Sequence, residues 1–114
     1  MHALWLAFLN SWRGLVHGAR TERAVRLELA LLVVGVPAAL VLGATLWVRV
    51  ALIATLLLML AAEFLNTAIE KLCDHLHPGR HPRIGLVKDL ASAGTFSAQA
   101  IAALVWIAAT VERL

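Results

Sequence analysis

Three long stretches of the chain contain no charged residue. They cover positions 29–48, 50–62 and 90–111. The hydrocarbon core of a bilayer is about 30 Å thick, and about 20 helical residues cross it. The pattern therefore predicts three transmembrane helices, at about residues 24–48, 50–73 and 89–111. Gly35 and Pro37 lie inside the first of them, where membrane helices tolerate both residue types, and a mild kink is expected there.

The N-terminal segment follows a different pattern, that of an amphipathic helix. Its apolar side chains fall within about one third of the helix circumference, and they are Leu4, Trp5, Phe8, Trp12, Leu15, Val16 and Ala19. The opposite side carries His2, Asn10, Arg13, His17 and Arg20, with Leu6 as the one apolar exception. A basic face opposite Trp and Phe is typical of a helix that lies in the membrane surface. We expect residues 1–20 to form such an interfacial helix, with Thr21 capping the next helix and Glu22 at its positively polarised start.

Composition excludes a soluble globule. The chain has 114 residues, of which 61% are hydrophobic and 15% are charged, whereas soluble domains are about half apolar and a quarter charged. A domain of this size buries only about two thirds of its surface, so most of the apolar material needs lipid around it. We therefore expect residues 1–114 to form a single all-α integral membrane domain. The single Cys73 allows no internal disulfide, and no C-x-x-C pair indicates zinc or redox chemistry.

The basic residues predict the orientation of the chain. Eight of them flank one side of the predicted spans and two flank the other: Arg13, Arg20, Arg23, Arg26, Lys71, Arg80, Arg83 and Lys88 against Arg49 and Arg113. The positive-inside rule places the N-terminus in the cytoplasm, and Trp47 and Trp106 then mark the outer interface. The net charge of +3, without a nucleic-acid-binding module, favours contact with anionic lipid and phosphate and no nucleic acid.

A polar stripe runs along the second predicted span. Counted from Glu63 as position i, Asn66, Glu70 and Asp74 stand at i+3, i+7 and i+11 and share one face of a helix. An ionisable group inside the membrane costs roughly 3 kcal/mol on insertion scales, and it usually faces a bundle interior with a functional role. The alternative is a stripe that only joins helices through hydrogen bonds, but two carboxylates and an amide exceed what that requires.

A second polar set is expected at the same inner boundary. Lys88, Asp89 and Ser92 begin the third span, while Glu22 and Arg26 lie one turn apart at the start of the first. Glu22 and Glu70 are hard oxygen ligands suited to Mg²⁺, and Lys88 with Arg80 or Arg83 can neutralise phosphate. This combination favours phosphoryl transfer, in which positioning and charge neutralisation supply most of the catalysis. Taken singly, these charges are also ordinary anchors beside a span, and that interpretation is the favoured one for Arg23, Lys71 and Arg83.

These residues resemble a known family. The string Glu63-Phe64-Leu65-Asn66-Thr67-Ala68-Ile69-Glu70, followed by Asp74 and then by Lys88-Asp89, is closely similar to the small integral membrane kinases of bacteria, prokaryotic diacylglycerol kinase and the related undecaprenol kinase. The spacing of Lys88 from Asp74, at i+14, also fits this family. Ser11-Trp12-Arg13-Gly14-Leu15 and Glu22 with Arg26 match at the family's surface helix and first acidic ligand. The resemblance spans nearly the whole chain.

The resemblance implies roles for individual residues. Glu63 is the expected catalytic base and lipid contact, Glu22 and Glu70 are the expected Mg²⁺ ligands, and Ser92 is a further lipid contact. The expected ATP contacts are Glu22, Glu70, Lys88, Asp89, Asp74, Asn66, Gly79, Arg80, His81 and Asn10. The family phosphorylates a membrane lipid alcohol with ATP and Mg²⁺ in the bacterial inner membrane, as a homotrimer with sites shared between subunits. Diacylglycerol, converted to phosphatidic acid, is the expected substrate and undecaprenol the alternative.

Two departures from the family bear on the lipid. The family usually continues from small residues into Ala-Val, whereas here Ala91-Ser92-Ala93-Gly94 is followed by Thr95-Phe96-Ser97-Ala98-Gln99, which indicates a more polar wall of the lipid site. Ala91 and Thr95 with their small neighbours equally suit close helix packing. Leu27 stands where diacylglycerol-type members often have a polar residue. The sequence therefore leaves the identity of the lipid open.

Two other classes fit the sequence less well than a kinase. A small multidrug-type transporter has a similar length and one intramembrane Glu, but it needs a fourth span and has no use for four charged groups at the inner face. A metal site among Cys73, Asp74, His75, His77 and His81 lacks the spacing of structural zinc, and a solvated loop is favoured there.

Overall fold

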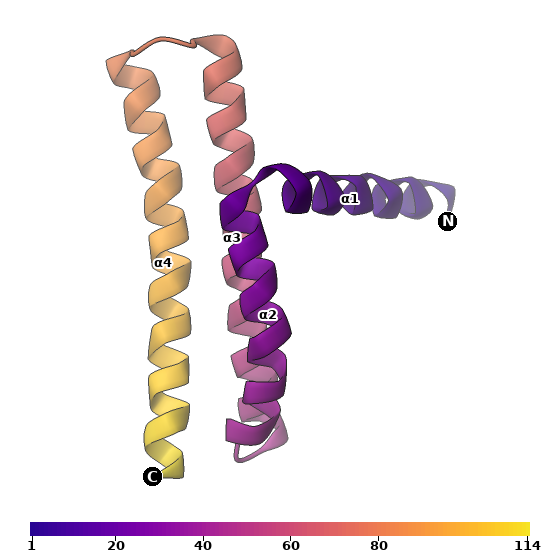
Figure 1. Cartoon of the computed structure of the whole chain (residues 1–114), viewed down its shortest axis with the longest axis vertical. Coiled ribbons are helices and arrows are strands. Elements are labelled where there is room, and N and C mark those ends of the chain that lie inside the picture. Colours follow the sequence, from indigo (N-terminus) through magenta and orange to yellow (C-terminus); the bar gives the residue numbers. More distant parts are fainter.

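The computed structural model describes residues 1–114 as four α-helices without strands. They are α1 (His2–Thr21), α2 (Arg23–Leu42), α3 (Leu46–Leu76) and α4 (Pro82–Arg113). Figure 1 shows α2, α3 and α4 side by side, whereas α1 projects sideways from the start of α2. Helices α2, α3 and α4 are all long and apolar enough to cross a membrane. The predicted class, an N-terminal helix followed by three spanning helices, is thus confirmed.

The turn between α2 and α3 lies earlier than the sequence pattern predicts. Helix α2 ends at Leu42 and not at residue 48, and α3 begins at Leu46. The prediction was wrong because it placed the break at the charged Arg49, whereas Thr45 sets it: its hydroxyl oxygen accepts a hydrogen bond from the backbone N–H of Val48 at 3.3 Å. The Arg49 guanidinium then donates to the carbonyl of Gly43 at 3.1 Å.

Two other helix starts also differ from expectation. The hydroxyl of Thr21 donates back to the carbonyl of His17 at 2.8 Å, so Thr21 closes α1 and Glu22 takes the N-cap position of α2. Helix α4 begins at Pro82, well before the expected start at 89, because proline suits the first turn of a helix. The His81 ring caps α4 by accepting from the backbone N–H of Arg83 at 3.2 Å.

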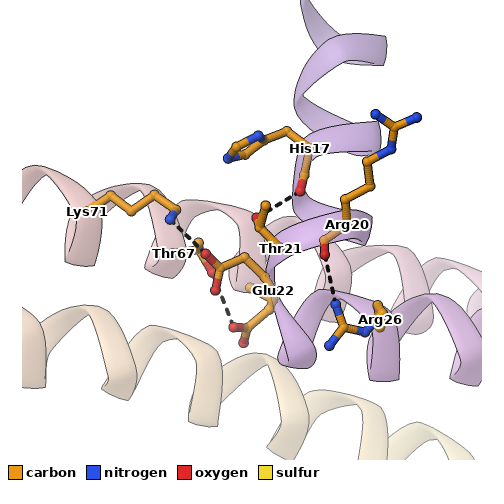
Figure 2. Close-up of polar contacts among 8 residues, drawn as sticks. His17, Arg20, Thr21, Glu22, Arg26, Thr67 and Lys71 are labelled. Carbon is orange, nitrogen blue, oxygen red and sulfur yellow. Dashed lines mark hydrogen bonds and ion pairs between the residues drawn. The ribbon is translucent and has the colours of Figure 1, made fainter.

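The junction of α1 and α2, residues 18–26, is held by hydrogen bonds and is called the elbow below. The Arg26 guanidinium donates to the carbonyls of Ala19 and Arg20 at 3.3 and 3.2 Å, which satisfies acceptors that the end of α1 leaves free (Figure 2). Gly18 is buried, and a Cβ atom there would lie 2.8 Å from the Phe64 ring of α3. A side chain at this position would force the Phe64 ring to shift, so the close approach of α1 to α3 favours glycine here.

We expect Gly18→Ala to leave the protein less stable than Gly14→Ala does. Alanine is favoured over glycine within a helix by up to about 1 kcal/mol, and Gly14→Ala should gain that amount because nothing lies within 4 Å of its new methyl group. At Gly18 the methyl group displaces Phe64, which costs about 1 kcal/mol or more. Thermal unfolding in detergent, followed by tryptophan fluorescence, checks the difference between the two variants. Equal midpoints would contradict the close packing of the elbow.

Helices α3 and α4 form the most extensive pair and run antiparallel. Near the C-terminal end of α4, the Trp106 indole N–H donates to the Thr55 hydroxyl at 3.0 Å, and near its start Lys88 pairs with Asp74 at 2.5 Å. Trp106 is half-buried in the bundle rather than simply marking the outer interface, whereas Trp47 is exposed.

Very little of the apolar material is buried within one chain. Only 14 of the 114 residues are buried, and large side chains such as Val41, Phe96 and Leu104 are more than 70% exposed. Exposing this much apolar surface to water would be strongly unfavourable. Apolar patches of this extent mark contacts with membranes or other proteins. The isolated fold is therefore a membrane bundle whose outer surface is completed by lipid or by further subunits.

Candidate functional site

The polar stripe lies on the half of α3 that leads to the loop at residues 77–81. Within it, the Thr67 hydroxyl donates to the Glu63 carboxylate at 3.4 Å, and the Asn66 amide donates to Glu70 at 3.3 Å. Glu63 is only 8% exposed, whereas Glu70 and Asp74 are exposed. The stripe therefore leads from a buried carboxylate to groups that reach the aqueous end of the bundle.

Glu22 reaches this stripe from the elbow. Although it occupies the N-cap position of α2, its carboxylate accepts no capping hydrogen bond and instead pairs with Lys71 of α3 at 2.8 Å (Figure 2). An acidic residue at an N-cap normally bonds its own helix. The side chain is thus directed to α3, beside Glu63 and Glu70.

The site gathers three carboxylates from two helices. Glu22 and Glu70 both lie within electrostatic range of Glu63. Glu28 of α2, which was not singled out from the sequence, is buried to the same 8% exposure as Glu63 and lies within electrostatic range of it. Its position directly before the first uncharged run was the available signal.

The donor set suits Mg²⁺ in the presence of phosphate. No group of three His, Cys, Asp or Glu side chains is arranged to hold a metal ion by itself. Glu22 and Glu70 instead offer two hard carboxylates, partly or fully exposed, on different helices. Mg²⁺ is commonly held by one or two carboxylates together with water and substrate phosphates, so the residues present fit this ion.

A basic hollow lies at the aqueous end of α3 and α4. Its volume is about 500 Å³, and Gly79, Arg80, His81 and Lys88 line it. All four are among the nucleotide contacts expected from the sequence, and Lys88 also meets Asp74 of the stripe at 2.5 Å. Glycine, arginine and lysine around an open hollow are suited to phosphate groups.

Three predicted site residues make no contact with this centre in a single chain. Asn10 lies about 18 Å of helix before Glu22 and accepts a hydrogen bond from Arg13. Asp89 and Ser92 are exposed on α4 without a hydrogen-bonding side-chain partner.

The antiparallel pairs Lys88–Asp74 and Trp106–Thr55 set the register of α3 and α4, and this register brings Asn66 and Thr95, each with a buried polar atom, to about the same level. The Asn66 carbonyl oxygen and the Thr95 hydroxyl are both buried without a hydrogen-bond partner. Thr95 lies at i+7 from Lys88, and Trp106 lies at i+11 from Thr95, so all three share the side of α4 that faces α3. Thr95, noted above as a departure from the family, thus adds polarity to the helix pair close to the site.

Comparison with known proteins gives one family. Residues 9–110 match the family model described as prokaryotic diacylglycerol kinase. A diacylglycerol kinase of Haemophilus influenzae is 35% identical over 96 residues, which is 84% of this chain and 81% of the relative. Proteins of the same name from Pseudomonas aeruginosa and Escherichia coli are 36% and 33% identical, with 84% of this chain and 78% and 79% of the relatives covered.

Proposed function

Because the chain belongs to the prokaryotic diacylglycerol kinase family, we propose that it transfers the γ-phosphate of ATP to the hydroxyl of diacylglycerol. The observation that carries this proposal is the buried carboxylate of Glu63, with Glu22 and Glu70 beside it. The site lies where spanning helices meet a basic aqueous end, so a lipid and a nucleotide can reach it from different phases. The bond between the γ-phosphorus and the oxygen that bridges it to the β-phosphate breaks in this step, so the products are phosphatidic acid and ADP.

Glu63 acts as the general base. It removes the proton of the lipid hydroxyl as that oxygen attacks phosphorus, which requires the carboxylate to be ionised and within hydrogen-bond reach of the oxygen. Thr67, which donates to Glu63 at 3.4 Å, orients the carboxylate. Burial keeps bulk water away from the nucleophile and so favours transfer to lipid over hydrolysis.

Glu22 and Glu70 would hold Mg²⁺, and the basic end would hold the nucleotide. The ion supplies charge neutralisation on the phosphate oxygens. Asn66 orients Glu70 through the hydrogen bond at 3.3 Å, and Asp74 orients Lys88 towards the hollow at Gly79, Arg80 and His81. Asp89 completes the nucleotide contacts and Ser92 contacts the lipid.

The lipid chains have a groove in which to lie. An apolar groove of about 380 Å³ runs between α2, α3 and α4, and Val34, Leu56, Met59, Gln99 and Trp106 are among its lining residues. Met59 precedes Glu63 by about one turn of α3. An acyl chain in this groove therefore brings its headgroup to the level of Glu63.

The protein resides in the bacterial inner membrane with its N-terminus in the cytoplasm. Eight basic residues at the site end of the bundle against two at the other support this orientation. In this orientation, α1 lies in the inner membrane surface and the hollow opens to cytoplasmic ATP.

The active form is a homotrimer with shared sites. Support comes from the exposed apolar surface of α2–α4 and from Asn10, which a single chain leaves about 18 Å of helix away from Glu22. Two subunits can supply what one cannot, since closed symmetric assemblies repeat the same contact.

A mixing experiment tests the shared site. Glu63→Gln and Asn10→Ala chains, each impaired alone, should recover part of the activity when they are dissociated and reassembled together, because in some mixed oligomers Asn10 of one subunit completes the site around the intact Glu63 of its neighbour. Phosphorylated lipid is measured, and each variant reassembled alone is the control. No recovery in mixtures that cross-linking shows to contain both chains would mean that each subunit carries its own site.

The lipid preference is tested with a panel of alcohols. Purified protein in mixed micelles should phosphorylate diacylglycerol faster than undecaprenol, and chelation of Mg²⁺ should stop both reactions. A faster reaction with undecaprenol would contradict the proposed substrate. Transfer that continues after chelation would contradict the role of the metal.

A further inference from the structure

The ion pair between Glu22 and Lys71 links the elbow to α3 at the edge of the site. The Lys71 ammonium lies 2.8 Å from the Glu22 carboxylate, and the two side chains are 55% and 28% exposed, Lys71 being the more exposed. Figure 2 shows them reaching towards each other from the two helices. Lys71 also follows Glu70 directly in the sequence, so it stands next to both proposed metal ligands.

The elbow does not need this pair to hold its shape. Arg26 bonds the last carbonyls of α1, and Gly18 packs against Phe64. Exposed ion pairs contribute little to stability. The main effect of Lys71 is therefore on the charge and the availability of the Glu22 carboxylate.

A lysine side chain can release the Glu22 carboxylate more readily than an arginine could. Its ammonium is a point charge on a flexible four-carbon stem, whereas an arginine can hold a carboxylate with two parallel hydrogen bonds. Lys71 covers an oxygen atom that Glu22 would otherwise offer to a cation. It also neutralises Glu22, which lies within electrostatic range of the buried Glu63.

We propose that Lys71 is a built-in placeholder for the divalent cation: it occupies Glu22 in the metal-free site and must be displaced when the cation binds. Lys71 thereby sets the cation concentration at which the site fills. This inference rests on the proposed function, because it takes Glu22 and Glu70 as the metal ligands. Lys71 is a positioning residue and not a ligand.

Binding of Mn²⁺ alone, followed by the electron paramagnetic resonance of the free ion in detergent micelles, tests the competition. Lys71→Met should lower the half-saturating Mn²⁺ concentration about two- to fivefold, the range expected for loss of an exposed ion pair. Lys71→Arg should raise it, because the guanidinium holds Glu22 more firmly. Arg23→Met is the matched control, since Arg23 adjoins Glu22 in the chain and is exposed but forms no ion pair.

The two Lys71 variants must shift the affinity in opposite directions. An effect of Lys71→Met no larger than that of Arg23→Met, or weaker binding in Lys71→Met, overturns the inference. Glu70→Gln separates this failure from that of the metal site. If Glu70→Gln weakens Mn²⁺ binding and Lys71→Met acts like Arg23→Met, only the placeholder role is wrong. If wild-type protein shows no binding that depends on Glu70, the metal part of the proposed function fails with it.

Discussion

Glu63→Gln is expected to lower the turnover of lipid phosphorylation about 10²- to 10⁴-fold, the usual cost of deleting a general base. Glutamine keeps the size of the side chain and can still bond Thr67, so the fold and the affinity for ATP should be nearly unchanged. Steady-state rates in mixed micelles, together with nucleotide binding, check both parts of this expectation.

Glu28→Gln is the matched control for that result. Both carboxylates are 8% exposed and lie within electrostatic range of each other, so a general effect of removing a buried charge should affect both variants equally. We expect Glu28→Gln to lose far less activity than Glu63→Gln. Near-normal turnover of Glu63→Gln would remove Glu63 from the role of base.

Loss of either proposed metal ligand should weaken the dependence on Mg²⁺ strongly. Glu22→Gln and Glu70→Gln should each raise the half-saturating Mg²⁺ concentration at least about tenfold. Even substitution of a residue that only hydrogen-bonds to a metal ligand commonly lowers metal affinity by this factor. The double variant should lose less than the product of the two effects, because residues that act as a unit are not additive. Titration of the initial rate with Mg²⁺ gives all three values.

Asp74→Asn serves as a control for these variants. This substitution also removes an exposed carboxylate from the stripe, but Asp74 pairs with Lys88 and is not a proposed metal ligand. It should therefore lower nucleotide affinity more than it changes the Mg²⁺ dependence. If the two substitutions lowered the reaction rate by factors that simply multiply in the double variant, and if the half-saturating Mg²⁺ concentration stayed unchanged, Glu22 and Glu70 would be ordinary surface anchors.

Sequence periodicity was sufficient for the helices but not for all of their ends. The uncharged runs and the amphipathic N-terminus predicted four helices. A spanning helix needs only a long enough apolar segment, and an interfacial helix needs only one apolar face. The turn at residues 43–45 was missed because it contains no charge and depends on the hydroxyl of Thr45. Local hydrogen bonding, which hydropathy does not register, decided that boundary.

The site was predictable where its residues share one helix and less so where helices meet. The spacing of Glu63, Asn66 and Glu70 fixes their common face, and the expected approach of Lys88 to this stripe is seen in its pair with Asp74. The pairing of Lys71 with Glu22 and the burial of Glu28 depend on how α2 packs against α3. Spacing within one helix carries no information about that packing, so Lys71 was interpreted as an anchor.

A single-turnover experiment tests the central claim most directly. Folded wild-type protein is mixed with diacylglycerol, Mg²⁺ and ATP radiolabelled in the γ-phosphate, and the label is followed into the organic phase. We expect the label to leave ATP and to appear in phosphatidic acid, with little inorganic phosphate. Label that stays in ATP, or that is released only as inorganic phosphate, would contradict transfer to the lipid.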